Sequence, residues 1–156
     1  MARVGFAREL ARKTLEELEI RTLPVDVIQI AQAYGVRVEA FKGWPKTLRG
    51  RLWRTHFLIG VNVEDIETRQ RFTIAHELGH FLMRHDSDEF TEYESSLDSP
   101  KQEFDIEASE FASELLMPLK WVKADFVKIR SADQMVYRYN VSKTAMWLRL
   151  VRLKLV

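Results

Sequence analysis

The chain has 156 residues, of which 46% are hydrophobic and 30% are charged, and its formal net charge is +1. These values are typical of one globular domain, and the lack of an apolar run of about 18 residues excludes a membrane-spanning helix. The sequence contains no cysteine, which excludes disulfides and thiolate ligands, so a metal ion would have to bind histidine, aspartate or glutamate.

The start of the chain, MARVGFARELARK, lacks the apolar segment of a secretory signal, and we expect a cytoplasmic protein. The small net charge combines two opposed regions. Residues 86–114 contain eleven acidic residues and one lysine, whereas residues 119–156 contain nine basic and two acidic residues. Solvated faces are the simplest interpretation, and contact with a partner or nucleic acid through the basic end is the alternative.

The first part of the chain predicts two helices and then two strands. Apolar residues recur at helical spacing over 8–20, and a second helix follows Pro24 and ends at Gly35. Alternating polar and apolar residues predict strands over 36–41 and 53–63. The turn-forming stretches GWPK and Leu48 to Gly50 lie between those strands.

A polar stretch, RHDSDEFTEYESSLDSPKQE, separates two strongly patterned helices further along the chain. Its length and its serine and acidic content predict a mobile loop over a site. We expect the part around Asp86 to Pro100 to restrain access to that site.

The segment TIAHELGHFLMRH contains the motif H-E-L-G-H on a helix predicted over 71–84. His76 and His80 project from the side opposite the apolar face, one turn apart, so both can bind one zinc ion. Glu77 lies beside the ion without ligating it and can accept the proton of a water molecule. Gly79 weakens a helix, which indicates close packing there. The motif predicts metal-assisted hydrolysis, and two surface histidines on an amphipathic helix are the alternative.

A third metal ligand is not obvious from the motif alone. A metzincin would continue with glycine and histidine where this chain has Met83 and Asp86, which excludes that class. His85 is the nearest remaining histidine, but a continuing helix would carry it to the apolar side, so we predict a capping or packing role. A glutamate from another helix is the other candidate.

The segment QEFDIEASEFASELLMP predicts a helix that Pro118 ends. Its glutamates share one face: Glu103, Glu107, Glu110 and Glu114. Four stacked carboxylates repel one another, which favours a cation beside them, although a solvated acidic face is the alternative. The pattern leaves the choice between Glu107 and Glu110 as the ligand open.

The stretches RQRFTIAHELGHFLMRH and EASEFASELLMP resemble the ImmA/IrrE family of zinc metallopeptidases, which are gluzincin-like enzymes with HExxH and a distant glutamate. A weaker similarity extends through PVDVIQIAQAYGVRV and VSKTAMWLRLVRLKLV, so it covers nearly the whole chain. The resemblance implies Zn²⁺ ligands at His76, His80 and Glu107, and a catalytic glutamate at Glu77.

The same resemblance implies a cytoplasmic metalloendopeptidase that cleaves a helix-turn-helix transcriptional repressor and so derepresses mobile-element or stress-response genes. A zinc-stabilised interaction module that titrates such a repressor without cleaving it is the alternative. Many relatives carry an N-terminal helix-turn-helix domain, whereas this sequence starts with the catalytic unit, and we expect no DNA targeting through such a domain.

We expect an α+β fold in which a small mixed or antiparallel sheet packs against a helical zinc-metallopeptidase core. The whole chain, 1–156, forms a single domain in this interpretation. Its expected parts are N-terminal helices (1–35), strands (36–64), the HExxH and glutamate helices (65–118) and a basic C-terminal helical segment (119–156).

The ending YNVSKTAMWLRLVRLKLV looks like the later part of a helix-turn-helix, with Ser142 as N-cap and Lys143, Arg149 and Arg152 available for phosphates. The structural interpretation, which we favour, buries one apolar face against the domain. That face consists of Val141, Ala145, Leu148, Val151 and Leu155. Direct DNA binding is therefore not expected.

Two expectations concern the substrate. The strand over 54–63 would lie at a sheet edge and pair with an extended peptide, such as an exposed, unstructured segment of the repressor. The group that stabilises the oxyanion stays open. Its candidates are several arginines together with His56, Tyr93, Tyr137 and Tyr139.

Overall fold

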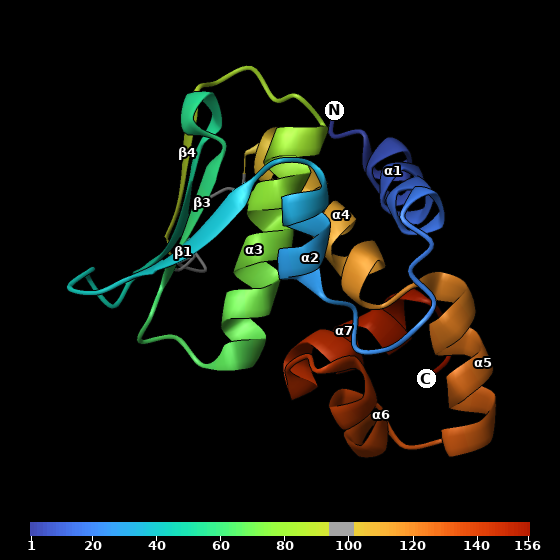
Figure 1. The fold of residues 1–156 in the computed structure, drawn as a ribbon. Coiled ribbons are helices and arrows are strands. Elements are labelled where there is room, and N and C mark those ends of the chain that lie inside the picture. The colour runs from blue at the N-terminus through green and yellow to red at the C-terminus, as the bar shows by residue number, and fades with distance from the viewer. Residues whose placement is uncertain (94–101) are drawn as a thin grey trace.

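A four-stranded mixed sheet lies beside a pair of packed helices in the computed structural model, which describes residues 1–93 and 102–156 (Figure 1). The elements in chain order are α1 (Val4–Glu17), α2 (Val27–Ala33), β1 (Arg37–Phe41), β2 (Leu48–Trp53), a short 3₁₀ helix (Arg54–His56), β3 (Leu58–Asn62), α3 (Glu67–Leu82), β4 (Glu89–Tyr93), α4 (Glu103–Leu116), α5 (Leu119–Ile129), α6 (Ala132–Tyr139) and α7 (Lys143–Arg152). The predicted α+β class is confirmed. None of the helices in these two ranges is both long and apolar enough to cross a membrane.

The two predicted N-terminal helices are present as α1 and α2. Helix α1 begins at Val4, four residues before the predicted start, and buries a stripe at helical spacing: Ala7, Ala11, Thr14 and Leu15. Helix α2 is capped by Asp26, whose carboxylate accepts a hydrogen bond of 3.0 Å from the backbone N–H of Gln29. The chain leaves α2 through Gly35, whose φ of +79° favours glycine.

The sheet has the strand order β1-β3-β2-β4, with β1 parallel to β3 and the other two pairs antiparallel. Two predictions are wrong here. The stretch Leu48 to Gly50 is not a turn but the start of β2, in which Leu48, Gly50 and Leu52 all face the buried side. The strand predicted over 53–63 is broken by the 3₁₀ helix, and its remainder, β3, is an interior strand rather than an edge.

The polar stretch after α3 is not wholly a loop. Residues Glu89–Tyr93 form strand β4, which pairs with β2 in the register Gly50↔Glu92 and Leu52↔Phe90. Phe90 and Glu92 pair with Leu52 and Gly50, two residues of the buried side of β2, and the many acidic residues conceal this strand in the sequence. The part of the predicted loop in 94–101 lies outside the described residues. The restraint on access expected from the stretch around Asp86 to Pro100 stays a prediction.

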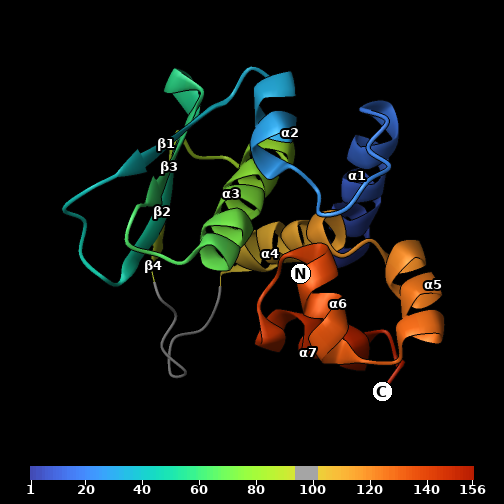
Figure 2. The same ribbon diagram turned by 60° about the horizontal axis from the view of Figure 1, so that its bottom comes forward.

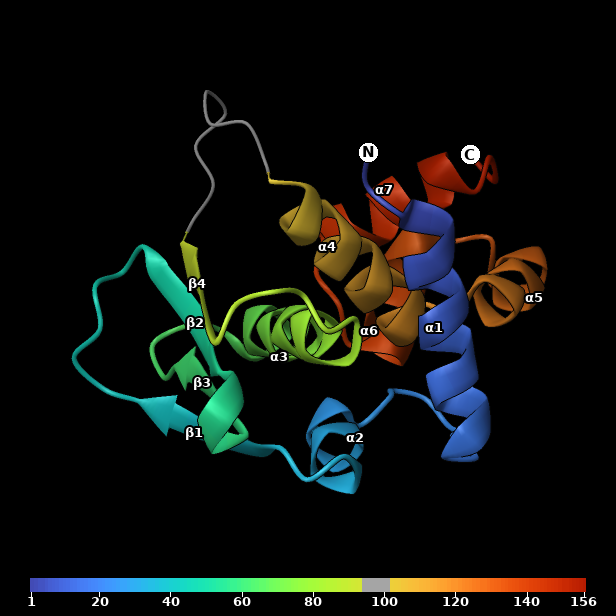
Figure 3. The ribbon, with the colours of Figure 1, turned by 90° about the horizontal axis from the view of Figure 1, so that it is seen from above.

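Helix α3 lies between the sheet on one side and α4 on the other, as the view from above shows (Figure 3). The close packing predicted at Gly79 is confirmed, because a Cβ atom there would lie 3.1 Å from Cα and from O of Ala108. Helix α1 packs against the opposite flank of α4 (Figure 3). The helix pair α3–α4 is therefore held from both sides, which fixes the side chains that face each other across it.

Helices α5 to α7 form a separate cluster against one end of this pair (Figure 2). Ser142 caps α7 as predicted, accepting a hydrogen bond of 3.0 Å from the N–H of Ala145. The predicted buried face is only partly right: Val141 is buried and Ala145 and Leu155 pack against the core, but Leu148 and Val151 are 48% and 44% exposed. The helix instead turns a different face inward: Met146, Arg149 and Leu150.

Arg149 explains that rotation of α7. Its Nε donates a hydrogen bond of 3.0 Å to the carbonyl of Met117, and its Nη2 lies 3.1 Å from a carboxylate oxygen of the buried Glu114. The predicted availability of Arg149 for phosphates is therefore wrong. A guanidinium that binds a buried carboxylate overrides the apolar pattern of one short helix.

Candidate metal centre

His76 and His80 lie one turn apart on α3, are only 2% and 1% exposed, and point their Nε2 atoms toward the same space. The two Nε2 atoms are 3.2 Å apart. Asp105, in the first turn of α4, brings Oδ1 to 3.1 Å from Nε2 of His80 and 3.6 Å from Nε2 of His76. Within the described part of the chain, these three residues form a group that could hold a metal ion.

The spacing of the three atoms fits tetrahedral coordination. A zinc ion with bonds of about 2.0–2.1 Å separates neighbouring ligand atoms by about 3.3 Å in a regular tetrahedron. The separations observed here are 3.1, 3.2 and 3.6 Å. The donor atoms, two imidazole nitrogens and one carboxylate oxygen, are also those that zinc sites use.

Two further carboxylates face the same space. Glu92 on β4 lies with Oε2 at 3.7 Å from Nε2 of His76. Glu77 on α3 is fully buried, and neither of its carboxylate oxygens has a hydrogen-bond partner among residues 1–93 and 102–156. A second potential metal-binding group, His76 with Glu77 and Glu92, therefore adjoins the first. Buried carboxylates without partners are costly unless a cation offsets their charge, which fits a metal ion at this point.

The electrostatic surroundings set the protonation of the two histidines. Burial lowers the pKa of His80 to about 4, so this ring is neutral near pH 7 and has a free lone pair. Burial alone would also lower the pKa of His76, but Glu92, Asp105 and Glu77 outweigh it and raise the pKa to about 9. Hydrogen bonds from the two histidines hold the pKa of Asp105 well below its usual range.

Glu77 has the opposite perturbation from Asp105. Burial raises the pKa of Glu77 well above that of an exposed glutamate, and the neighbouring charges of Glu92 and Asp105 add to the effect. A raised pKa makes the carboxylate of Glu77 a stronger proton acceptor than that of an exposed glutamate. The residue predicted as proton acceptor lies beside the histidine pair, and its catalytic role stays a prediction.

Glu107, which the resemblance implies as a zinc ligand, points away from the two Nε2 atoms. Its Oε1 lies 2.9 Å from Nε2 of His85, and its Oε2 accepts a hydrogen bond of 2.8 Å from the backbone N–H of Arg3. The guanidinium of Arg3 also binds it, at 3.0 Å. The ligand role of Glu107 stays a prediction, and the described geometry favours Asp105 in that position.

The glutamate stripe of α4 faces cationic groups from the start of the chain. Three of the pairs are Arg3–Glu107, Arg8–Glu110 and Arg12–Glu114, at distances of 3.0, 3.1 and 3.0 Å, and Glu103 binds the N-terminal amine of Met1. The N-terminal segment and α1 thus supply cations of the kind that the stacked carboxylates favour. Asp105 lies on the adjacent face of α4, outside the glutamate stripe. An aspartate in the first turn of a helix is commonly explained by the helix dipole, so the sequence pattern did not indicate Asp105 as a metal ligand.

His85 does not lie on the apolar side as predicted, because α3 ends before it. Helix α3 stops at Leu82, Arg84 adopts a positive φ of 56°, and the N–H of His85 bonds back to the carbonyl of His80 at 3.2 Å. The turn brings Nδ1 of His85 to 2.7 Å from Nδ1 of His80. No glycine or asparagine signals this left-handed residue in the sequence.

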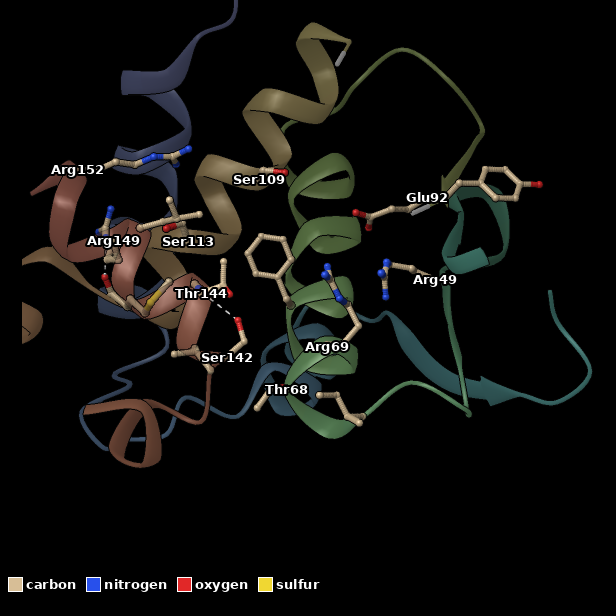
Figure 4. Close-up of a pocket in the computed structure, with 17 residues that line it drawn as sticks. Arg49, Thr68, Arg69, Glu92, Ser109, Ser113, Ser142, Thr144, Arg149 and Arg152 are labelled. Carbon is tan, nitrogen blue, oxygen red and sulfur yellow. Dashed lines mark hydrogen bonds between the residues drawn. The ribbon is translucent and has the colours of Figure 1, made fainter. Parts of the chain in front are cut away.

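A cavity of about 560 Å³ adjoins the metal centre (Figure 4). Glu92 reaches it from β4 and Ser109 from α4 (Figure 4). Oγ of Ser109 also lies 3.1 Å from Nδ1 of His76. Its other wall is formed by residues of α3 and α7, including Phe72 and Leu148. The cavity is large enough to receive side chains of a peptide that approaches the metal centre.

The candidates for oxyanion stabilisation separate by position. Tyr93 lines the cavity next to Glu92. Tyr139 is buried, and its hydroxyl donates a hydrogen bond of 2.6 Å to Asp125. Tyr93 is therefore the tyrosine that can meet a substrate beside the metal centre, and Tyr139 has a structural role.

Comparisons with known proteins bear on the family and the fold. The family model Peptidase_M78, described as IrrE N-terminal-like domain, matches residues 31–151. A search of curated proteins finds no match. Among solved structures, a Mycobacterium tuberculosis transcriptional regulator has a similar fold, with a TM-score of 0.71 at 18% sequence identity. The match covers 94% of this chain and 46% of the other, so this chain spans under half the length of that protein.

Proposed function

This chain belongs to the Peptidase_M78 family of IrrE N-terminal-like domains, and we propose that it is a cytoplasmic zinc endopeptidase that cleaves a helix-turn-helix repressor. Cleavage would derepress mobile-element or stress-response genes. The convergence of His76, His80 and Asp105 beside the unpartnered Glu77 is the observation that carries this proposal. A solved structure of similar fold is described as a transcriptional regulator, which supports a link to transcription.

In the proposed site, His76, His80 and Asp105 would hold the zinc ion. Nitrogen and oxygen donors at three positions suit a catalytic zinc site, which keeps a fourth position open. When bound, the ion supplies Lewis-acid chemistry, polarising a peptide carbonyl and making a water molecule more acidic. Ser109 accepts a hydrogen bond from Nδ1 of His76 in this assignment and thereby holds the ring with Nε2 toward the ion.

Glu77 would move the proton in the proposed reaction. Its carboxylate would accept a proton from the attacking water and pass it to the leaving amine. The pKa of Glu77 is raised by burial, so the group can retain the proton between these two transfers. Its backbone position on α3, between the ligands in sequence, keeps it next to the reacting atoms without binding the metal.

The edge of the sheet next to the metal centre suggests how a substrate would bind. Strand β4 pairs on one side with β2, and its other side carries no strand within 1–93 and 102–156. Glu92 on this strand faces His76 at 3.7 Å. An extended peptide could add to β4 by backbone hydrogen bonds and place side chains in the adjoining cavity. β4 is therefore the edge strand that we expect to pair with the substrate, in place of the strand predicted over 54–63.

Such binding requires an extended segment of substrate. Flexible linkers and tails of a repressor offer extended chain, whereas a folded DNA-binding core does not. We therefore place the cleavage site in an exposed, unstructured segment of the partner. The alternative, a zinc-stabilised module that titrates the repressor, needs the same metal ligands but not Glu77.

The substitution Glu77→Gln distinguishes the peptidase function from the titration function, because only the peptidase needs Glu77. The substitution keeps the shape of the side chain and should leave bound zinc unchanged while removing the proton acceptor. Wild-type protein and the variant would be incubated with a repressor encoded beside the gene, and fragments would be mapped by mass spectrometry. We expect fragments from the wild type, with at least about a 100-fold loss of rate in Glu77→Gln. Undiminished cleavage by the variant would refute the peptidase proposal.

The same reaction also tests titration. If no fragments form and both proteins reduce the DNA binding of the repressor equally, the titration function is supported in its place. Zinc content measured in both preparations controls for metal loss.

A further inference from the structure

A continuous line of hydrogen-bonding groups extends from His80 to the segment before α1. Nδ1 of His80 lies 2.7 Å from Nδ1 of His85, and Nε2 of His85 lies 2.9 Å from Oε1 of Glu107. Glu107 is held in turn by the backbone N–H and the guanidinium of Arg3, at 2.8 and 3.0 Å. His80 takes part in this line through Nδ1, the nitrogen that would not bind the metal. His85 takes part through both of its ring nitrogens.

The chemistry of the two ends sets the direction of the bonds once Nε2 of His80 binds a metal. Arg3 only donates, so the carboxylate of Glu107 accepts, and it also accepts from Nε2–H of His85. A neutral imidazole that binds a metal through Nε2 carries its hydrogen on Nδ1, so His80 donates and Nδ1 of His85 accepts. Without the metal, Oδ1 of Asp105 accepts from Nε2–H of His80 at 3.1 Å instead.

Ring packing holds both imidazoles in the required planes. The ring of His80 stacks on Phe90 of β4, with centroids 4.1 Å apart and planes at 10°. The ring of His85 stacks on Phe104 of α4, at 4.2 Å and 10°. Arg54 adds a third constraint, because its Nη2 donates to the backbone carbonyl of His80 at 2.7 Å. Neither ring can rotate without breaking a stack as well as a hydrogen bond.

We propose that His85, Glu107 and Arg3 form a positioning relay that fixes the tautomer and orientation of His80 for metal binding. The relay rests on the proposed function in that it assumes the same metal ligands. It assigns His85 and Glu107 a shared role outside the coordination sphere, as orienting partners of a histidine ligand. Partners of this kind typically change metal affinity by about 10–100-fold when removed.

The tautomers of His80 and His85 can be measured without substrate. Long-range proton–nitrogen NMR correlations distinguish Nδ1–H from Nε2–H imidazoles, and the chain has only four histidines to assign. In the zinc-loaded wild type we expect His80 with hydrogen on Nδ1 and His85 with hydrogen on Nε2. A His85 ring with hydrogen on Nδ1 in the zinc-loaded wild type would overturn the relay. This result is independent of whether the protein cleaves anything.

Variants of His85 add the metal readout. His85→Phe keeps a ring to stack on Phe104 but removes both nitrogens that orient His80, so zinc affinity should fall about 10–100-fold in chelator competition. His85→Gln, whose amide can accept and donate at once, should restore most of that affinity. Glu110→Gln is the matched control, because Glu110 lies on the same helix but binds Arg8 and Arg152.

The outcomes separate the relay from the proposed function. A zinc affinity of His85→Phe equal to that of the wild type and Glu110→Gln would overturn the relay, even if the protein proves to be a peptidase. The expected tautomers together with the loss and rescue of affinity would support the relay, even if the protein proves to titrate its partner.

Discussion

Gly50 on β2 packs closely against Thr73 of α3, and Gly50→Ala tests how tightly that contact positions the site. A Cβ atom added there would overlap the methyl group of Thr73 and would lie 3.2 Å from the carbonyl oxygen of Gly60. It would also reach 3.7 Å from Cγ of Glu77. Since β2 is held between β3 and β4, the strand cannot withdraw without disturbing two neighbours.

The expected cost follows from two opposed terms. Forcing a methyl group into a packed core costs about 1–3 kcal/mol, whereas replacing glycine by alanine stabilises by about 0.4–1 kcal/mol through the unfolded chain. We therefore expect Gly50→Ala to lower the free energy of unfolding by about 1–2 kcal/mol. Zinc affinity should fall as well, because Gly50 pairs in register with Glu92, which faces His76.

A second substitution isolates the contact. Thr73→Ser deletes the methyl group that the new Cβ would meet, so Gly50→Ala should cost less than about 1 kcal/mol in the Thr73→Ser background, and the double-mutant cycle should show coupling. Gly5→Ala is the control, since a Cβ at Gly5 meets nothing within 4 Å. Urea denaturation of the four proteins of the cycle and of the control measures all these terms. A Gly50→Ala protein as stable as the wild type, or a cycle without coupling, would refute the reasoning.

Two further predictions concern buried charge. Arg149→Ala should lower the free energy of unfolding, measured in urea, by about 3–5 kcal/mol, because it leaves the carboxylate of Glu114 buried without this partner. The control Arg152→Ala removes an exposed guanidinium and should lower the free energy of unfolding by under about 1 kcal/mol. Equal losses of stability in the two variants would contradict this prediction. Zinc affinity should rise about tenfold per pH unit between about pH 6 and 8, because His76, with its pKa raised to about 9, must release a proton on binding; calorimetry showing no pH dependence would contradict this.

The histidine pair could be predicted because its geometry is local. Residues four apart on a helix always face the same way, so His76 and His80 needed only the helix that the apolar pattern of α3 indicates. Asp105 and Glu92 could not be found in this way. Their places depend on how α4 and β4 pack against α3, which no spacing within one element specifies.

The errors have the same origin. Glycine is typical of turns, but at Gly50 the lack of a side chain allows β2 to pack closely against α3. The glutamates of α4 indicated a cation, but sequence pattern did not show that the N-terminal segment and α1 would supply cations as Arg3, Arg8 and Arg12. The sequence pattern predicted Arg149 to be available for phosphates, because it did not show that Arg149 pairs with the buried Glu114. In each case a tertiary partner decided a position that local propensity left open.

The central claim is that His76, His80 and Asp105 form the metal centre. A crystal structure of the zinc-loaded protein, with anomalous differences collected on both sides of the zinc absorption edge, tests it most directly. We predict one zinc peak bound by Nε2 of His76, Nε2 of His80 and a carboxylate oxygen of Asp105, with Glu107 still on His85. A zinc ion bound by Glu107 in place of Asp105, or no peak beside the two histidines, would contradict the claim.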